Sequence, residues 1–343
     1  MKIVNLRGRL KIMELFESLK QKIGDKGLRI VFPEGTEPRI LTAANRLYTE
    51  NLIKPILIGR VNEVKSAMAS SGLNTDALQI FDPENFDKFD EMVAAFVERR
   101  NGKATEEQAR QMLLDANYFG TMLVYMGLAD GMVSGAVHST GDTVRPALQI
   151  IKTRPGSSLV SGAFIMLRGR NAEEKYLFAD CAININPNAQ QLAEIAIDSC
   201  DTAKTFGFDS KVAMMSFSTK GSAKAPEVDK VIEATKIVKE LRPNGQVDGE
   251  LQFDAAFEPS VGKLKAPDSK VAGQATVFVF PDLQSGNIGY KIAQRLGGYE
   301  AVGPILQGLN KPVADLSRGC NPEDVYKLSI ITAAQALAAA ENN

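Results

Sequence analysis

Short apolar runs alternate with longer amphipathic segments along most of this chain of 343 residues. The runs are rich in Val and Ile, which suit buried strands, and the amphipathic segments have the length of helices. Strands and helices that alternate in this way form mostly parallel sheets flanked by helices, so the predicted fold class is α/β. The predicted strands are Leu28–Phe32, Pro55–Ile58, Gly131–Ser134, Ser158–Leu167, Tyr176–Ile183, Val212–Phe217, Thr276–Phe280 and Pro312–Leu316. The predicted helices are Glu37–Glu50, Asn62–Ser70, Asp87–Arg99, Glu106–Met126, Asp142–Ile151, Ala189–Phe206, Ala225–Leu241, Gly286–Leu296 and Pro322–Ala340.

Two segments rich in turn-forming residues indicate that the chain forms two domains. These segments are Lys152–Ser158, with Pro, Gly and Ser, and Tyr299–Leu309, with three further breakers. We expect an active-site cleft between the domains, where α/β proteins tend to bind ligands. The predicted first domain comprises residues 1–152 and 307–343, with 1–12 as a possible extension ahead of a second start at Met13, and the second comprises residues 153–306.

The composition favours an ordinary soluble protein and argues against several functional classes. The chain is 44% hydrophobic and 24% charged, and its net charge of −1 provides no positive field to recruit nucleic acid or a membrane. Three widely spaced cysteines, Cys181, Cys200 and Cys320, argue against a disulfide framework and against a zinc site. No apolar run approaches the roughly 18 residues of a membrane span, and no secretory leader is visible, so we expect a cytoplasmic protein.

The segment P-V-A-D-L-S-R-G-C-N-P-E-D, Pro312–Asp324, carries the clearest candidate site. An apolar strand breaks into a polar loop, and a helix begins at Asn321-Pro322, with Asn as the N-cap and Pro at the first helical position. Ser317 and Arg318 lie in the loop and Asp324 lies in the first helical turn, which suits holding an anion and moving a proton beside it. Alternatively, Asp324 only favours the helix dipole, and Arg318 is its ion-pair partner on the surface.

A glycine- and hydroxyl-rich turn, Gly135–Pro146, resembles an anion cradle that follows a strand. Ser139 and Thr140 provide hydroxyls and Arg145 lies on the next helix, so all three are candidates for binding an anionic substrate. His138 is the only histidine of the chain. It either takes part in acid–base chemistry near neutral pH or is a hydrogen-bonded loop residue.

Two further segments could bind phosphate groups or could be solvated surface. Ser216–Lys224 places hydroxyls and two lysines between a strand and a helix. On the helix that follows Pro281, Lys291 and Arg295 share one face because they are four residues apart, and Tyr290 is adjacent. We include these last three side chains among the candidates for substrate binding.

Cys320 lies inside the candidate anion loop, close to a cation and a helix start. These surroundings lower the pKa of a thiol, so Cys320 could be an acyl-accepting nucleophile. The alternative is a small buried residue with no part in the chemistry.

Read together, these motifs resemble the phosphate acetyl/butyryl transferase family. The matching strings run in family order from about Leu28 to the C-terminus, so the resemblance covers nearly the whole chain. Each string is weak evidence alone, but the ordered set is specific. The strings are V-S-G-A-V-H-S-T-G-D-T-V-R-P, F-A-D-C-A-I, M-M-S-F-S-T-K-G-S-A-K, V-D-G-E-L-Q-F-D-A-A, V-F-P-D-L-Q-S-G-N-I-G-Y-K-I-A-Q-R-L and D-L-S-R-G-C.

The resemblance implies a two-domain fold similar to isocitrate and isopropylmalate dehydrogenases, usually assembled as a homodimer. It implies the reversible reaction of acetyl-CoA with phosphate to give acetyl phosphate and CoA. CoA and acetyl-CoA are then substrates, and no cofactor or metal is expected. A phosphate butyryltransferase or a broader acyl-CoA:phosphate acyltransferase is the alternative within the family.

The same resemblance assigns roles to individual residues. Asp324 corresponds to the proposed base toward the CoA thiol, and Ser317 and Arg318 correspond to the residues at the acetyl phosphate. Arg145 matches an arginine tied to CoA binding.

Two more arginines are assigned to substrate binding in this way. Arg295 falls on a family arginine near the CoA or phosphate region. Arg99 corresponds to another, although the string E-R-R-N-G-K departs from the family's usual string there.

Two other classes of protein fit the pattern less well. A metal-dependent β-decarboxylating dehydrogenase of the same architecture needs clustered aspartates, whereas Asp180, Asp254 and Asp282 are scattered along the sequence. An acyl-CoA sensor without activity would not need an intact Ser-Arg pair followed by Asp324. The sequence therefore favours an enzyme.

Overall fold

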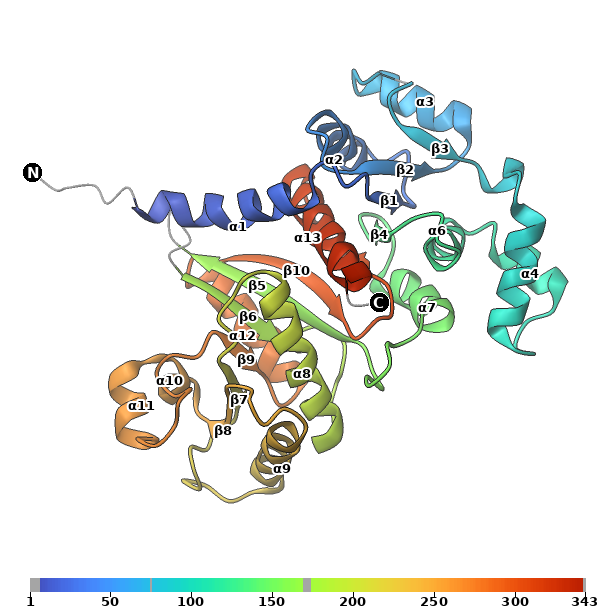
Figure 1. The fold of residues 1–343 in the computed structure, drawn as a ribbon. Coiled ribbons are helices and arrows are strands. Elements are labelled where there is room, and N and C mark those ends of the chain that lie inside the picture. Colours follow the sequence, from blue (N-terminus) through green and yellow to red (C-terminus); the bar gives the residue numbers. More distant parts are fainter. Residues whose placement is uncertain (1–6, 75, 169–173, 342–343) are drawn as a thin grey trace, which may run out of the picture. The chain divides into compact units, whose positions relative to one another are not determined.

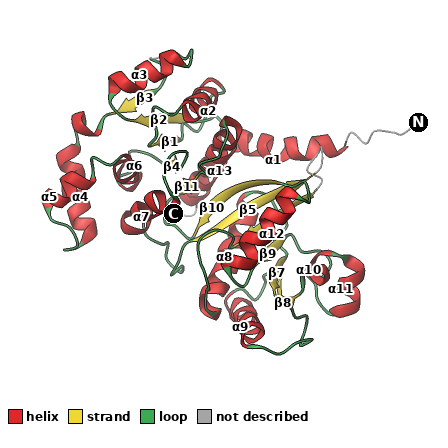
Figure 2. Cartoon of the chain, turned by 180° about the vertical axis from the view of Figure 1, so that it is seen from behind, coloured by secondary structure: helices red, strands yellow, loops and turns green. Residues whose placement is uncertain are grey.

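The structure is a computed structural model that describes residues 7–74, 76–168 and 174–341. Helices flank the β-sheets (Figures 1 and 2), which confirms the predicted α/β fold class. Within these ranges, no helix combines the length and the apolar sequence that crossing a membrane requires.

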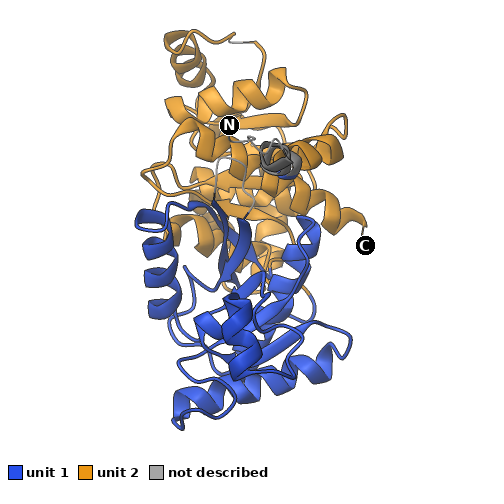
Figure 3. Ribbon diagram, turned by 90° about the vertical axis from the view of Figure 1, so that its left-hand side faces the viewer, with its two compact units in different colours: residues 1–15, 155–308 blue, residues 16–154, 309–343 orange. Residues whose placement is uncertain are grey.

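The chain divides into two compact units (Figure 3). Unit 1 comprises residues 1–15 and 155–308, and unit 2 comprises residues 16–154 and 309–343. In unit 2, the backbones on either side of the interruption pair with each other, since Thr153 bridges to Leu309.

Unit 2 is built on a five-stranded sheet in the order β11–β4–β1–β2–β3, and every neighbouring pair is parallel. In β1, Ile30, Val31 and Phe32 are fully buried, as expected for a strand covered on both faces. The strands are β1 (Arg29–Phe32), β2 (Lys54–Ile58), β3 (Gln79–Phe81), β4 (Gly131–Ser134) and β11 (Val313–Asp315). The helices are α1 (Arg7–Ile23), which runs from one unit into the other, and α2 (Pro38–Thr49), α3 (Val61–Ser70), η1 (Pro83–Asn85), α4 (Phe89–Arg100), α5 (Glu106–Met112), α6 (Ala116–Tyr125), α7 (Thr140–Ile150) and α13 (Pro322–Glu341).

The parallel arrangement brings three distant loops to one edge of this sheet. β1 pairs with β4 through Val31 and Met132, and β4 pairs with β11 through Ser134 and Asp315. The loops that follow these three strands therefore lie beside one another, although they are far apart in the sequence. Functional groups of parallel α/β sheets gather at this carboxyl edge.

Unit 1 contains a mixed six-stranded sheet in the order β10–β5–β6–β9–β7–β8. β10, β5 and β6 are antiparallel neighbours, and the remaining pairs are parallel. An aromatic core that includes Phe164, Phe178 and Phe278 packs on this sheet. The strands are β5 (Ser161–Arg168), β6 (Glu174–Ala179), β7 (Val212–Met215), β8 (Val247–Leu251), β9 (Val277–Val279) and β10 (Glu300–Gln307). The helices are α8 (Ala189–Thr205), α9 (Pro226–Leu241), α10 (Phe253–Phe257), α11 (Pro259–Lys265) and α12 (Leu283–Arg295).

The strands that the sequence did not predict, β3, β8 and β10, all lie at the edge of a sheet. An edge strand is paired on one side only, so it tolerates polar residues, Gly and Pro. In β10, Gly303 and Pro304 are residues typical of a domain boundary, so this segment was predicted as one. In β8, the string V-D-G-E-L contains a glycine and two acidic residues, so it was not predicted as a strand.

The helix predicted over Glu106–Met126 is wrong, because two helices, α5 and α6, occupy this range. The Asp115 carboxylate accepts hydrogen bonds from Asn117 N at 2.9 Å and Tyr118 N at 3.1 Å. This side chain therefore caps a new helix and interrupts the apolar pattern.

Candidate active site

The loop after β11 presents the predicted Ser317–Arg318 pair on the surface. Leu316 N donates to Ser134 O, which extends the β11–β4 pairing by one residue before the chain turns. Ser317 and Arg318 are exposed, and Cys320 turns back into the protein as its N–H donates to Ser317 O at 2.9 Å. Within the described residues, the Arg318 guanidinium has no ion-pair or hydrogen-bond partner, so it is available to an anion.

Asp324 lies in the first turn of α13 and caps the start of that helix. Asn321 Oδ1 accepts from Glu323 N at 2.8 Å and from Asp324 N at 3.0 Å. In return, Asp324 Oδ2 accepts from Asn321 N at 2.9 Å. This reciprocal cap agrees with the first half of the alternative interpretation. The second half of that interpretation is an ion pair between Asp324 and Arg318. Among the described residues, these two side chains form no such pair.

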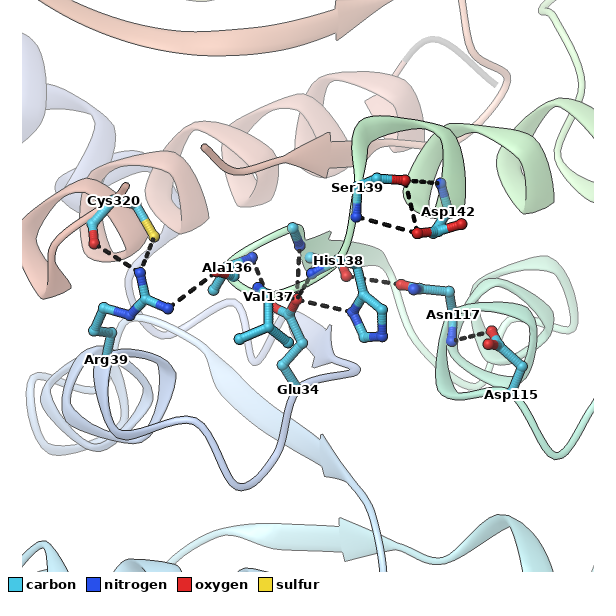
Figure 4. A network of polar contacts seen from close by, with 12 residues as sticks. Glu34, Arg39, Asp115, Asn117, Ala136, Val137, His138, Ser139, Asp142 and Cys320 are labelled. Carbon is cyan, nitrogen blue, oxygen red and sulfur yellow. Dashed lines mark hydrogen bonds and ion pairs between the residues drawn. The ribbon is translucent and has the colours of Figure 1, made fainter. Parts of the chain in front are cut away.

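Arg39, which sequence reasoning did not single out, holds the Ser317–Arg318 loop by its backbone. Arg39 lies near the start of α2, and its Nη1 donates to Arg318 O at 2.8 Å and to Cys320 O at 3.1 Å. Its Nη2 donates to Ala136 O at 3.0 Å in the loop after β4 (Figure 4). One guanidinium thus joins two loops that are far apart in the sequence. Ala136 in the first loop and Ser317 in the second are separated by 181 positions. Local motifs contain no signal for such contacts.

The predicted anion cradle after β4 is filled by a carboxylate of the protein itself. The Glu34 carboxylate accepts from four consecutive backbone N–H groups: Gly135 at 3.2 Å, Ala136 at 2.9 Å, Val137 at 2.8 Å and His138 at 3.0 Å (Figure 4). Burial disfavours the charge, but these hydrogen bonds and that of the His138 ring outweigh burial and lower the pKa of Glu34. The loop therefore binds an anion, as its sequence indicates, but the anion is internal.

His138 is held by the same carboxylate. Its Nδ1 lies 2.8 Å from Glu34 Oε1 (Figure 4). This hydrogen bond raises the pKa of His138, although partial burial acts in the opposite direction. The contact matches the interpretation of His138 as a hydrogen-bonded loop residue.

Ser139, Thr140 and Arg145 lie along the first turns of α7, directly after the Glu34-filled loop. Ser139 and Asp142 form a reciprocal cap, in which Ser139 N donates to Asp142 Oδ2 at 3.2 Å and Asp142 N donates to Ser139 Oγ at 3.3 Å. Thr140 Oγ1 donates to Asp315 Oδ2 at 2.7 Å, which links α7 to β11. Arg145 is exposed on the next turn.

Asp315 is a buried carboxyl group, 2% exposed, at the end of β11 and two residues before Ser317. Burial raises the pKa of Asp315 to about 6, and the charge of Glu34 adds to this increase, whereas the hydroxyls of Thr140 and Thr143 act against it. The sequence predicts this position as part of a strand, which the structure confirms. An acidic residue at the carboxyl end of an apolar run was the signal that could have revealed it.

Arg99 uses its guanidinium within unit 2. Its Nε donates to Ile150 O at 2.6 Å and its Nη2 donates to Ile151 O at 3.0 Å, so it caps the C-terminal end of α7. The guanidinium also lies 5.1 Å from the ring centre of Tyr125. Binding of a substrate phosphate by Arg99 would have to compete with these contacts.

The three remaining candidates lie in unit 1, on α12. Tyr290 stacks on Phe164 with ring centres 4.2 Å apart, and Lys291 Nζ lies 5.8 Å from the centre of the Tyr290 ring. Lys291 and Arg295 are exposed. The residues predicted to bind substrate are therefore distributed over both units.

The Ser216–Lys224 loop of unit 1 is also organised around an internal carboxylate. Glu250 Oε1 accepts from Gly221 N at 2.6 Å and from Ser218 Oγ at 3.1 Å. Lys220 Nζ donates to Asp248 at 2.7 Å. These contacts account for part of the loop without a ligand.

Cys320 has the surroundings of a structural thiol. Burial raises its pKa, while the Arg39 guanidinium, 3.8 Å from Sγ, acts in the opposite direction. The thiolate needed for nucleophilic attack is thus disfavoured. The described part of the chain also contains no group of three or more His, Cys, Asp or Glu side chains that could hold a metal ion.

Comparisons with known proteins agree with this architecture. A family model described as phosphate acetyl/butaryl transferase matches residues 14–333. Phosphate acetyltransferase of Bacillus subtilis (strain 168) is 61% identical over 324 residues, which cover 94% of this chain and 99% of that protein. A phosphotransacetylase from Streptococcus pyogenes has a crystal structure that matches with a TM-score of 0.93 at 60% identity, covering 98% of this chain and all of that one.

A second solved structure, the EutD phosphotransacetylase from Staphylococcus aureus, matches with a TM-score of 0.90 at 55% identity over 95% of this chain and 99% of that one. The resemblance found in the sequence motifs is confirmed by these matches. The chain belongs to the phosphate acetyl/butaryl transferase family.

Proposed function

We propose that this chain is a phosphate acetyltransferase, an acyltransferase that catalyses the reversible reaction of acetyl-CoA with inorganic phosphate to give acetyl phosphate and CoA. Relatives at 57–61% identity carry that name, which supports acetyl rather than butyryl as the transferred group. One observation carries the proposal at the level of atoms. It is the exposed Ser317–Arg318 pair, on a loop whose backbone is held by Arg39.

The chemistry requires a thiol to attack an acetyl carbonyl while phosphate leaves. A free thiol has a pKa near 8.5, so little thiolate exists at neutral pH and a base assists the attack. Asp324 takes the thiol proton in this scheme. Arg318 neutralises the departing phosphate through a planar two-point contact, and Ser317 donates to the carbonyl oxygen as it becomes negatively charged.

The cap formed by Asp324 bears on its role as a base. Its Oδ2 is oriented by Asn321 N, so the carboxylate has a defined direction. We expect Asp324→Asn to reduce the rate of the chemical step. Full rescue by saturating CoA would instead assign Asp324 to substrate binding.

CoA carries several phosphate groups, and the side chains proposed to bind them are cationic or carry a hydroxyl. On α7 these are Arg145, Ser139 and Thr140, although both hydroxyls already have partners within the protein. The scheme uses CoA, acetyl phosphate and phosphate as small-molecule substrates and requires no cofactor, nucleic acid or membrane. The remaining proposed contacts are Tyr290, Lys291, Arg295 and Arg99.

We propose further that the protein is a cytoplasmic homodimer. Exposed apolar side chains support the dimer, because Ile288 and Ile292 on α12 and Leu296 directly after it recur every four residues and are 56%, 53% and 85% exposed. Such a stripe on a helix is typical of a surface that a second protein covers. Sedimentation at micromolar concentration tests the dimer, and a charged substitution at Ile292 should shift it toward the monomer.

The direct test of the activity is phosphate-dependent or arsenate-dependent cleavage of acetyl-CoA by the purified protein. The proposal expects thiol release only when one of these anions is present. Binding of acetyl-CoA without release would indicate a sensor and would overturn the proposal. Parallel assays with acetyl, propionyl and butyryl phosphate determine the range of acyl groups.

A further inference from the structure

Asp315 connects two loops of unit 2 without reaching the surface itself. Its Oδ2 accepts the Thr140 hydroxyl at 2.7 Å, at the start of α7. Two residues later the backbone enters the exposed Ser317–Arg318 pair. A displacement of this carboxyl group would therefore move both the start of α7 and the loop that carries the proposed chemistry.

The loop after β4 leaves room for the Asp315 carboxyl group only because residue 135 is glycine. A Cβ built on Gly135 would lie 2.6 Å from Asp315 Oδ1 and 2.6 Å from Leu316 O, and φ at this glycine is +111°. Oδ1 is buried and makes no hydrogen bond of regular geometry within the described residues, and the same holds for Thr143 Oγ1 one turn along α7, although the Thr143 hydroxyl is close enough to lower the pKa of Asp315. A buried carboxylate with an unpartnered oxygen is expensive, so a structural role alone does not explain why an acid stands here.

We propose that Asp315 is a positioning residue for the transfer reaction: by accepting the Thr140 hydroxyl it fixes the start of α7 relative to the Ser317–Arg318 loop, and its ionised form holds this link more firmly. The inference rests on the proposed function. A hydrogen bond to a charged acceptor is stronger than one to a neutral acceptor, so ionisation tightens the link.

Two buried carboxyl groups lie close together at this edge, and their surroundings separate them. Glu34 is surrounded by N–H donors and stays charged, whereas burial and the charge of Glu34 raise the pKa of Asp315 to about 6. The link therefore changes strength in a pH range where an enzyme can work. The charged groups on the elements that pack around Asp315 are Glu34 after β1, His138 after β4, Asp142 and Arg145 on α7, Arg318 after β11, and Glu323, Asp324, Lys327 and Glu341 on α13.

The test compares Asp315→Asn with the wild-type protein, because asparagine keeps an oxygen for Thr140 but never ionises. With acetyl phosphate and CoA as substrates, kcat and KM are measured in the same buffers on both sides of the Asp315 pKa of about 6. The ratio of wild-type to variant kcat/KM should be near one below that pKa and rise to about fivefold above it. Titration of the substrates and of His138 cancels in this ratio.

Two threonine variants provide the matched controls. Thr140→Val removes the donor and should cause the same loss as Asp315→Asn above the pKa, mainly in kcat, with no further loss in the double variant. Thr49→Val, at the exposed end of α2 where the hydroxyl donates only to Arg46 O, should keep its kcat/KM. Circular dichroism confirms that each variant is folded.

The outcomes separate this inference from the proposed function. Absence of acetyl transfer in the wild-type protein overturns the proposed function. Activity in the wild type with a pH-independent ratio, or additive losses in the double variant, overturns the role of Asp315. A loss in Asp315→Asn of more than about a hundredfold at every pH would also overturn it, because that size indicates direct proton transfer.

Discussion

The loops after β4 and β11 lie at the same edge of one sheet, but they differ in whether their polar groups are bonded within the protein or exposed. In the β4 loop, four backbone N–H groups and the His138 ring all converge on the buried Glu34 carboxylate. In the β11 loop, Arg39 holds the backbone carbonyls, and the side chains of Ser317 and Arg318 remain exposed. The first loop is therefore saturated internally and acts as a support, while the second has polar groups left for a substrate.

The saturated type of loop recurs in unit 1. Asp180 accepts from the N–H groups of Gly162, Ala182, Ile183 and Asn184 at 2.8–3.1 Å. Two of the family strings, V-S-G-A-V-H-S-T-G-D-T-V-R-P and F-A-D-C-A-I, thus lie at loops organised by buried carboxylates. A glycine- and hydroxyl-rich turn after a strand indicates an anion site, but the anion can belong to the protein.

The largest expected effect tests the exposed loop. Arg318→Ala should reduce turnover about a thousandfold, because the departing phosphate loses its counter-charge, and should leave stability nearly unchanged. Steady-state kinetics and urea unfolding measure the two quantities. Arg318→Lys keeps the charge without the planar fork and should recover only part of the rate. Near-normal turnover in Arg318→Ala would remove the contrast between the two loops.

The next effect tests the saturated loop. Glu34→Gln removes the charge that four N–H groups share and places an NH2 group against at least the backbone N–H of Ala136, which bonds Oε2, so it should lower the free energy of unfolding by about 3 kcal/mol at neutral pH. The folded-state pKa of Glu34 is lowered, so its stabilisation is present above the unfolded value of 4.5 and is lost as the pH falls through the folded value.

Urea unfolding at several pH values should therefore show the two proteins converging in acid. Glu63→Gln, on the exposed surface of α3, is the control and should leave stability within about 0.5 kcal/mol. Equal stability of Glu34→Gln and wild type at neutral pH would show that the loop does not depend on the carboxylate.

A smaller effect on stability, an increase instead of a decrease, is expected when Asp315, which links the two loops, is replaced. The folded-state pKa of Asp315 is raised from 3.8 to about 6, so the stability that its neutral form contributes is present at low pH and lost as the pH rises through about 6. Asp315→Asn stays neutral and should be more stable than wild type at pH 8, by on the order of 2 kcal/mol, and equally stable in acid. Thermal unfolding at both pH values checks this. A less stable variant at pH 8 would mean that the Asp315 charge supports the fold.

The smallest effect is expected at Cys320. Cys320→Ala removes a buried thiol and should cost about 1 kcal/mol of stability with turnover retained, since transfer is direct in the proposed scheme. Incubation of the wild-type protein with radiolabelled acetyl phosphate in the absence of CoA should leave no label on the chain. A trapped acetyl group that disappears in Cys320→Ala would instead indicate a covalent route through this loop.

The sequence predicted those features that depend on local patterns. The strand-loop-helix order around Ser317 and Asp324 follows from an apolar run, breakers and an Asn-Pro helix start, all within a few residues. Buried strands in the middle of each sheet were predicted for the same reason. Short edge strands such as β3 and β8 were missed, because β3 has only three residues and β8 contains Asp, Gly and Glu, and because their pairing partner supplies the constraint.

The contacts that complete the site were beyond local patterns. Arg39 meets Arg318 O across 279 positions, and Glu34 meets the His138 loop across 104. Side chains at such separations are brought together by strand order, which one sequence does not specify. Asp315 was missed for a different reason, since an acidic residue inside an apolar run was taken as an ordinary part of a strand.

Arg39 donates to the carbonyl oxygens of residues 136, 318 and 320, and every amino acid has such an oxygen. Apart from the 3.8 Å contact of Arg39 with Cys320 Sγ, this anchoring does not depend on which side chains the loop carries. Divergent descendants could therefore exchange the residues at 317, 318 or 320 and change their chemistry while the same backbone path is kept. The arrangement makes the loop a place where new specificities can evolve without rebuilding the scaffold.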